Sequence, residues 1–151
     1  MREGFLVAKP VSILLLEDDD ADAKAVMRAF RKAKIVNPVH RAVDGIEALD
    51  ILRGKDGSAA LSEPYIILAD INMPRMSGLE FLQELRADAR LKQAIVFMLT
   101  TSKRDTDRVT AYDLNVAGYI VKERAGEDFL SLAQMLSQYW EIVELPGSKG
   151  E

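Results

Sequence analysis

The chain has 151 residues, of which 48% are hydrophobic and 29% charged, and this balance is typical of one compact globular domain. A net charge of −4 without any Lys/Arg run argues against nucleic-acid binding, and the absence of cysteine excludes disulfides and cysteine-based zinc sites. Because residues 1–10 do not form a signal peptide and no apolar run reaches membrane-spanning length, we expect a cytoplasmic protein without a membrane partner.

Apolar runs of strand length alternate along the chain with segments of helical periodicity. The run at 11–16 is almost wholly apolar and stops at an acidic cluster. Over 21–33 the apolar residues then recur every three or four positions, as they do in an amphipathic helix. This alternation continues, with strands predicted at 39–43, 65–69, 94–99 and 117–121 and helices near 46–52, 79–85, 104–114 and 128–139.

Strands that are each followed by a helix require a parallel sheet covered on both faces. The runs at 11–16, 65–69 and 94–99 have the apolar character of central strands, whereas 39–43 is more polar and suits an edge. The sequence therefore predicts an α/β fold, a flavodoxin-like (βα)5 doubly wound sandwich with a parallel five-stranded sheet of order 2-1-3-4-5. We assign this domain to 11–141, an N-terminal extension to 1–10 and a C-terminal tail to 142–151.

Polar residues stand where four of the expected strands end. Glu17 and Asp18 follow the first strand, Asp70 the third, Thr100 the fourth and Lys122 the fifth. Ligands bind at this edge of a doubly wound sheet. Three carboxylates packed together repel one another, and a hard divalent cation removes that conflict. We therefore expect Mg²⁺ to be bound directly by Asp18 and Asp70, with Glu17 acting through water.

The same groups suit the transfer of a phosphoryl group. A carboxylate beside magnesium can act as the nucleophile, and the protein then mainly positions groups and neutralises charge. Asp70 is the expected phosphoacceptor, while Lys122 offers a positive charge and Thr100 a hydroxyl to the phosphoryl oxygens. Thr101 competes with Thr100 for that role, and only the spacing to Lys122 favours Thr100. The backbone carbonyl of Asn72 is a further candidate ligand for Mg²⁺.

Four segments in this order and spacing resemble the response-regulator receiver family of two-component signalling. They lie at 13–18, 67–74, 98–100 and 118–122, and the resemblance extends from 11 to about 139. It implies that a histidine kinase phosphorylates Asp70, that Thr100 is the switch hydroxyl and that Lys122 contacts the phosphate. It also implies that Glu17 and Asp18 are the acidic pair and that Tyr119 is the aromatic switch.

More narrowly, the chain resembles single-domain response regulators paired with bacterial phytochrome kinases. The Glu-Asp pair, the Leu-Thr-Thr-Ser at 99–102 and the segment 140–146 carry this likeness. It implies a phytochrome histidine kinase as partner, a downstream phosphotransfer or target protein, and a homodimer. Two positions depart from the family. Glu123 stands where proline is usual, so we expect a looser connection over 123–126, and Ala69 replaces a larger aliphatic residue, which we interpret as packing.

Large apolar side chains continue beyond the expected core. They are Trp140, Ile142, Val143, Leu145 and Pro146. Each would forgo about 1.5–3 kcal/mol of burial if it stayed exposed, and contiguous exposed apolar patches usually mark interfaces. We therefore predict that the last helix and the segment after it form a homodimer interface. The alternative is that the segment folds back onto its own sheet edge or last helix.

Three other functions fit the sequence less well. A degenerate receiver that only binds partners would not need the complete set of site residues. An aspartate-nucleophile phosphatase commonly has a second Asp two residues after the first, where this chain has Asn72. A flavin carrier would need a hydroxyl- and glycine-rich loop in place of the acidic 17–20. His40, the only histidine, lies on the polar edge strand and reads as structural, so we expect no enzyme beyond catalysis of its own phosphorylation and dephosphorylation.

Overall fold

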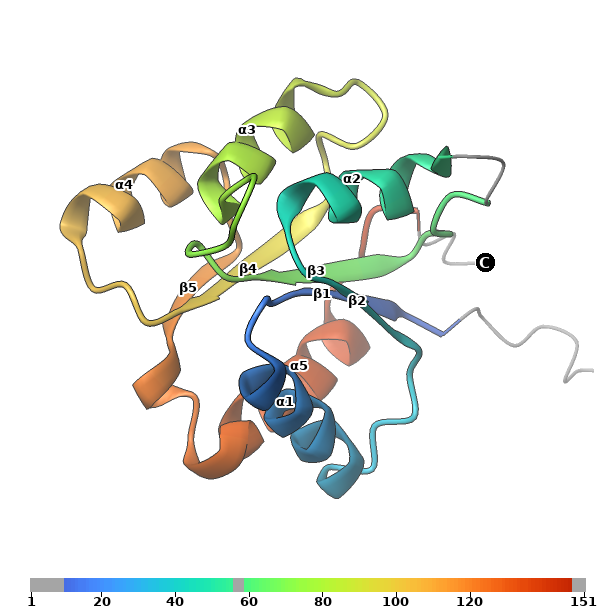
Figure 1. Cartoon of the computed structure of the whole chain (residues 1–151). Helices are drawn as coiled ribbons and strands as arrows, with labels where there is room; N and C mark the ends of the chain where they lie inside the picture. Colours follow the sequence, from blue (N-terminus) through green and yellow to red (C-terminus); the bar gives the residue numbers. More distant parts are fainter. Residues whose placement is uncertain (1–9, 56–58, 148–151) are drawn as a thin grey trace, which may run out of the picture.

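The computed structural model describes residues 10–55 and 59–147, which form a parallel sheet between two layers of helices (Figure 1). Residues 1–9 of the expected N-terminal extension at 1–10 and residues 148–151 of the expected tail at 142–151 lie outside the described residues. The strands are β1 (Ser12–Leu16), β2 (Val39–Ala42), β3 (Tyr65–Ala69), β4 (Ile95–Thr100) and β5 (Gly118–Val121). The helices are α1 (Asp20–Lys32), α2 (Gly45–Arg53), α3 (Gly78–Ala87), α4 (Asp105–Asp113) and α5 (Leu130–Ile142). The order β2-β1-β3-β4-β5 confirms the predicted fold.

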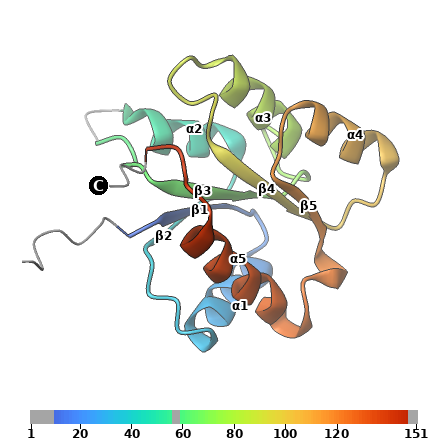
Figure 2. The same ribbon diagram turned by 180° about the vertical axis from the view of Figure 1, so that it is seen from behind.

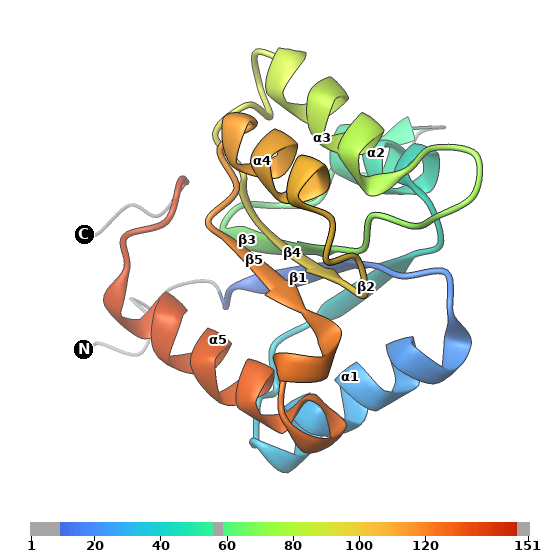
Figure 3. The ribbon, with the colours of Figure 1, turned by 90° about the vertical axis from the view of Figure 1, so that its left-hand side faces the viewer.

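Each strand supplies side chains to two separate hydrophobic cores. Successive side chains of a strand point to opposite faces of the sheet. Leu14, Ile67 and Val96 therefore pack with residues of α2, α3 and α4, while Ile13 and Ile66 pack with residues of α1 and α5. Figure 3 shows these two layers edge-on, and Figure 2 shows α1 and α5 together on one face. None of the helices in the described part of the chain has the length and apolar character needed to cross a membrane.

Polar caps start three helices close to the ends of strands. Asp19, Asp44 and Ser77 precede α1, α2 and α3, and each side chain accepts a hydrogen bond from a backbone N–H of the first turn. Such caps satisfy donors that the helix itself leaves unpaired. The cap at Asp19 starts α1 directly after Asp18, which keeps the acidic pair in a very short loop at the sheet edge.

The last helix begins later and ends later than the predicted 128–139. Asp128 and Phe129 have φ angles of 51° and 63°, a left-handed conformation that cannot continue into a right-handed helix, so α5 begins at Leu130. The helix then runs through Trp140 to Ile142. Two short 3₁₀ turns, Lys122–Arg124 and Glu127–Phe129, lie in the connection from β5 to α5, and the expected looseness over 123–126 stays a prediction.

The segment after α5 turns back onto its own domain. Leu145 is only 5% exposed and belongs to the core on the α1 and α5 side of the sheet. Gly147 has a φ of 83° and passes so close to Glu63 that an added Cβ would lie 2.4 Å from the Glu63 Cβ. Leu145 thus folds back onto its own domain, as the alternative to a dimer interface predicts. Ile142 remains 80% exposed and Val143 38% exposed.

Candidate functional site

Three carboxylates and one ammonium group meet at the carboxyl ends of β1, β3 and β5. One carboxylate oxygen from each of Glu17, Asp18 and Asp70 lies within 4.8 Å of the other two. The Nζ atom of Lys122 lies 2.7 Å from Glu17 Oε1 and 3.1 Å from Asp70 Oδ2. The structure therefore brings together four of the residues that the sequence singled out, and it places them at the predicted edge of the sheet.

The site carries more negative than positive charge. Glu17 is 1% exposed and Asp70 5% exposed, whereas Asp18 lies at the surface. Burial raises the pKa of Glu17 to about 7, although the hydrogen bond and charge of Lys122 act in the opposite direction. Burial alone would lower the pKa of Lys122, but hydrogen bonds to Asp22 and Glu17 and the charge of Asp70 outweigh it and raise the pKa. Lys122 therefore stays cationic and offsets only part of the carboxylate charge.

The oxygen cluster fits a small hard cation. Oxygens that share an octahedral Mg²⁺ at about 2.1 Å lie roughly 3 to 4 Å apart, so small side-chain rotations would bring the carboxylates of Asp18 and Asp70 to that spacing, with Glu17 near enough to act through water. Carboxylates are the ligand type that Mg²⁺ prefers, and exposed Asp18 leaves room for the waters that it retains. Asn72 is exposed, and its N–H donates to Asp70 Oδ1 at 3.3 Å. The role of its backbone carbonyl as a Mg²⁺ ligand stays a prediction.

Thr100 and Tyr119 both contact the backbone of Ser102. Thr100 is fully buried, and its Oγ1 accepts a hydrogen bond from the Ser102 N–H at 3.2 Å. The Tyr119 hydroxyl donates to the Ser102 carbonyl at 3.1 Å, and Ser102 Oγ donates to Asp107 of α4 at 2.6 Å. Thr101 is exposed, so burial favours Thr100 as the hydroxyl that faces the site. Thr100 is therefore linked to α4 by hydrogen bonds through Ser102.

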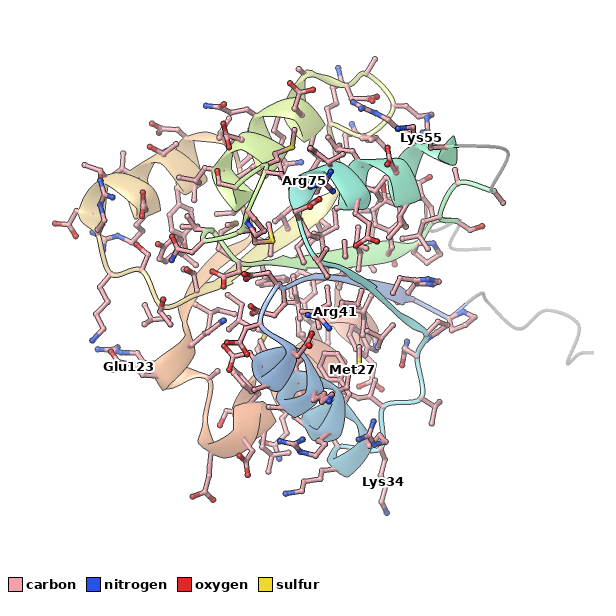
Figure 4. All side chains as sticks on the ribbon, viewed as in Figure 1. Met27, Lys34, Arg41, Lys55, Arg75 and Glu123 are labelled. Atoms are coloured by element: carbon pink, nitrogen blue, oxygen red, sulfur yellow. The ribbon has the colours of Figure 1, made fainter. Side chains whose placement is uncertain are left out.

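An ion pair between the buried Asp44 and the largely exposed Arg75 joins the two loops on the α2 and α3 side of the site. Arg75 Nε donates to Asp44 Oδ2 at 2.7 Å, and Asp44 is 2% exposed (Figure 4). Burial alone would raise the pKa of Asp44, but the N–H of Glu47 and the Arg75 guanidinium hold it below its usual value. Gly78 tightens the same loop, because a Cβ there would lie 2.1 Å from the Asp70 carbonyl oxygen. These contacts hold the backbone that follows Asp70.

Arg41 fixes the acidic loop from the opposite side of the sheet. Its Nε donates to the Glu17 carbonyl at 2.9 Å, and its Nη1 lies 2.8 Å from Asp20 Oδ1, so it joins β2 to the start of α1 (Figure 4). Arg41 and Arg75 were not among the predicted site residues, because no sequence pattern pairs them with partners so far along the chain. Asp22 was not among the predicted site residues either, yet it contacts Lys122.

The chain is similar to known proteins both in sequence and in structure. A family model described as "Response regulator receiver domain" matches residues 13–134. The response regulator Rcp1 of Synechocystis sp. is 32% identical over 140 residues, which cover 92% of this chain and 95% of Rcp1. The structure of the phosphorylated cyanobacterial phytochrome response regulator RcpA matches with a TM-score of 0.81 at 32% identity, covering 91% of this chain and 99% of RcpA. The Mn²⁺-bound form of Rcp1 matches with a TM-score of 0.78 at 32% identity and the same two coverages, 91% and 99%.

Asp18→Asn should stabilise the metal-free protein. The substitution removes a negative charge near Glu17 and Asp70, and Lys122 contacts those two carboxylates. We expect the free energy of unfolding to rise by up to about 1 kcal/mol, the Coulomb energy of such a charge pair in a water-like dielectric. Urea unfolding in EDTA measures it. Glu144→Gln, at an exposed position beyond α5, is the control and should leave stability unchanged, and a less stable Asp18→Asn would contradict the prediction.

Proposed function

The chain belongs to the response regulator receiver family, and on that premise we propose that it accepts a phosphoryl group on Asp70 from a histidine kinase and signals through protein contacts. The observation that carries this proposal is the approach of Lys122 to Asp70, 3.1 Å, beside the acidic pair. Such a site has a nucleophile, a place for a cation and a fixed positive charge. Those are the parts that phosphoryl transfer requires.

In the proposed reaction a carboxylate oxygen of Asp70 forms the new bond to phosphorus. The bond from phosphorus to the histidine nitrogen breaks, and that nitrogen keeps the electron pair. Lys122 and Thr100 each donate a hydrogen bond to a phosphoryl oxygen, which spreads the charge of the transferring group. Asp18 and Asp70, with Glu17 nearby, would hold Mg²⁺, whose charge would offset the negative charge of the carboxylate and the phosphoryl group. The Mn²⁺-bound form of Rcp1 supports a divalent cation in this family.

The competing functions have less support. A receiver that only binds partners would have no need of the assembled cluster of carboxylates and Lys122, which the structure contains. Asn72 lacks the acid–base group of an aspartate-nucleophile phosphatase. The description of RcpA as a phytochrome response regulator supports a phytochrome histidine kinase as the donor, and we propose a cytoplasmic location with it. We also propose that a phosphotransfer or other target protein receives the signal by direct contact.

The proposed phosphoacceptor is tested by intact mass. Incubation with acetyl phosphate and Mg²⁺ should add the mass of one phosphoryl group to the wild-type chain and none to Asp70→Asn, because the amide cannot serve as the nucleophile. EDTA should abolish the gain. Asp105→Asn, in the exposed first turn of α4, is the matched control and should be phosphorylated like wild type. Stable phosphorylation of Asp70→Asn at the wild-type rate would show that the assignment is wrong.

The proposed switch is tested separately from the chemistry. A phosphoryl group adds about −1.5 to −2 charge and strong acceptors, which draw the Thr100 hydroxyl away from Ser102. Tyr119 and α4 then lose their present hydrogen-bonded arrangement. We expect hydrogen exchange in Asp105–Asp113 to change on phosphorylation of wild type and of Thr101→Ala, but not of Thr100→Ala. A wild-type response in phosphorylated Thr100→Ala would contradict this role.

The proposed homodimer has a narrower interface than the sequence suggested. Met135 and Ile142 lie two turns apart on one face of α5 and are 38% and 80% exposed, with Val143 next to them, whereas Leu145 belongs to the chain's own core. Truncation at 139 would remove that core residue, so Ile142→Glu is the cleaner test. Light scattering at tens of micromolar should show a wild-type dimer and an Ile142→Glu monomer. The control Val36→Glu, at a 93% exposed position, should dimerise, and a monomeric wild type would rule the interface out.

A further inference from the structure

All three N–H donors of Lys122 face carboxylates. Its Nζ lies 2.7 Å from Glu17 Oε1, 2.7 Å from Asp22 Oδ2 and 3.1 Å from Asp70 Oδ2. An ammonium group has three donors and no acceptor, and the Lys122 side chain is only 9% exposed. A phosphoryl oxygen on Asp70 therefore receives a hydrogen bond from Lys122 only when one of these carboxylates gives it up.

Asp22 differs from the other two partners of Lys122. It belongs to the first turn of α1, and it lies outside the cluster that Glu17, Asp18 and Asp70 form. A cation in that cluster and a phosphoryl group on Asp70 both compete with Lys122 for Glu17 and Asp70. Neither of them engages Asp22. Asp22 is thus the carboxylate that keeps its contact with Lys122 while the other two are withdrawn.

Resting on the proposed function, we propose that Asp22 weakens the hold of Lys122 on the phosphoryl group and so sets the affinity of the site for phosphoryl ligands. The Asp22 carboxylate offsets part of the ammonium charge and repels the phosphoryl oxygens. It acts through Lys122 and contacts no reacting atom. The same negative charge attracts a cation, so its removal should affect the two ligands of the site in opposite directions.

The competing role for Asp22 is to orient Lys122, and two substitutions separate orientation from charge. Asp22→Asn retains an oxygen that accepts the Lys122 hydrogen bond but loses the charge, whereas Asp22→Ala loses both. Asp20→Asn is the matched control. It makes the same charge change in the same first turn of α1, so the effect on the helix dipole is shared, but Asp20 pairs with Arg41 at 2.8 Å and not with Lys122.

Calorimetric titration of the full chain tests the proposal with two probes. The first is Mg²⁺ alone, and the second is beryllofluoride, a phosphoryl mimic, at saturating Mg²⁺. We expect Asp22→Asn and Asp22→Ala to bind beryllofluoride about two- to fivefold more tightly than wild type and Mg²⁺ about two- to fivefold more weakly. Asp20→Asn should leave the beryllofluoride affinity unchanged. The differences should shrink as salt is raised, because Asp22 is 36% exposed.

The remaining outcomes each overturn the proposal. Weaker beryllofluoride binding by Asp22→Ala, with wild-type binding by Asp22→Asn, would show that Asp22 only orients Lys122. Equal tightening in Asp20→Asn would show a general effect of net charge. A wild type that binds both probes, with Asp22 variants identical to it, contradicts this inference alone. A wild type that binds neither probe contradicts the proposed function as well.

Discussion

The mutual repulsion of Glu17, Asp18 and Asp70 is the constraint on which the rest of the site depends. In a flexible chain these carboxylates would move apart, but here each follows a strand whose backbone is hydrogen-bonded on both sides. Leu16 and Ala69, the last residues of those strands, are fully buried, so separating the charges would expose the core. Burial contributes about 25 cal/mol per Å² of apolar surface, and the whole sheet resists the repulsion. Lys122 relieves part of the repulsion that remains, and the proposed divalent cation would relieve more of it.

Two arginines, Arg41 and Arg75, hold the loops around the site from opposite faces of the sheet. Arg41 contacts the Glu17 carbonyl from the α1 side, and Arg75 contacts buried Asp44 on the α2 side. Neither points its charge at the carboxylates of the cluster, so the guanidinium groups fix backbone without neutralising the site. This arrangement separates the groups that shape the site from Lys122, which carries its positive charge. Loss of either arginine would therefore change the positions of the loops that form the site, while the carboxylates and Lys122 themselves would still be present.

The fold and the main site residues could be predicted because parallel strands bring their carboxyl ends to one edge. The apolar runs located the strands, and the polar residues that follow them were therefore predicted to lie together; these are Glu17, Asp18, Asp70 and Lys122. Side-chain contacts between distant segments could not be predicted in this way. The contact of Asp22 with Lys122 depends on rotamers and on how closely α1 approaches the end of β5. The predicted start of α5 was wrong because hydrophobic periodicity does not reveal that Asp128 and Phe129 adopt a left-handed backbone conformation.

The return of the chain past Glu63 places its described C-terminal end beside the amino end of β3. Asp70 stands at the other end of that strand, and five residues at about 3.3 Å each separate the two by roughly 17 Å. A fluorophore or surface tether attached at Gly147 would thus lie at the pole of the molecule opposite the acidic cluster. A protein held by that end would keep the acidic cluster, and with it the proposed phosphoacceptor, on the side away from the support.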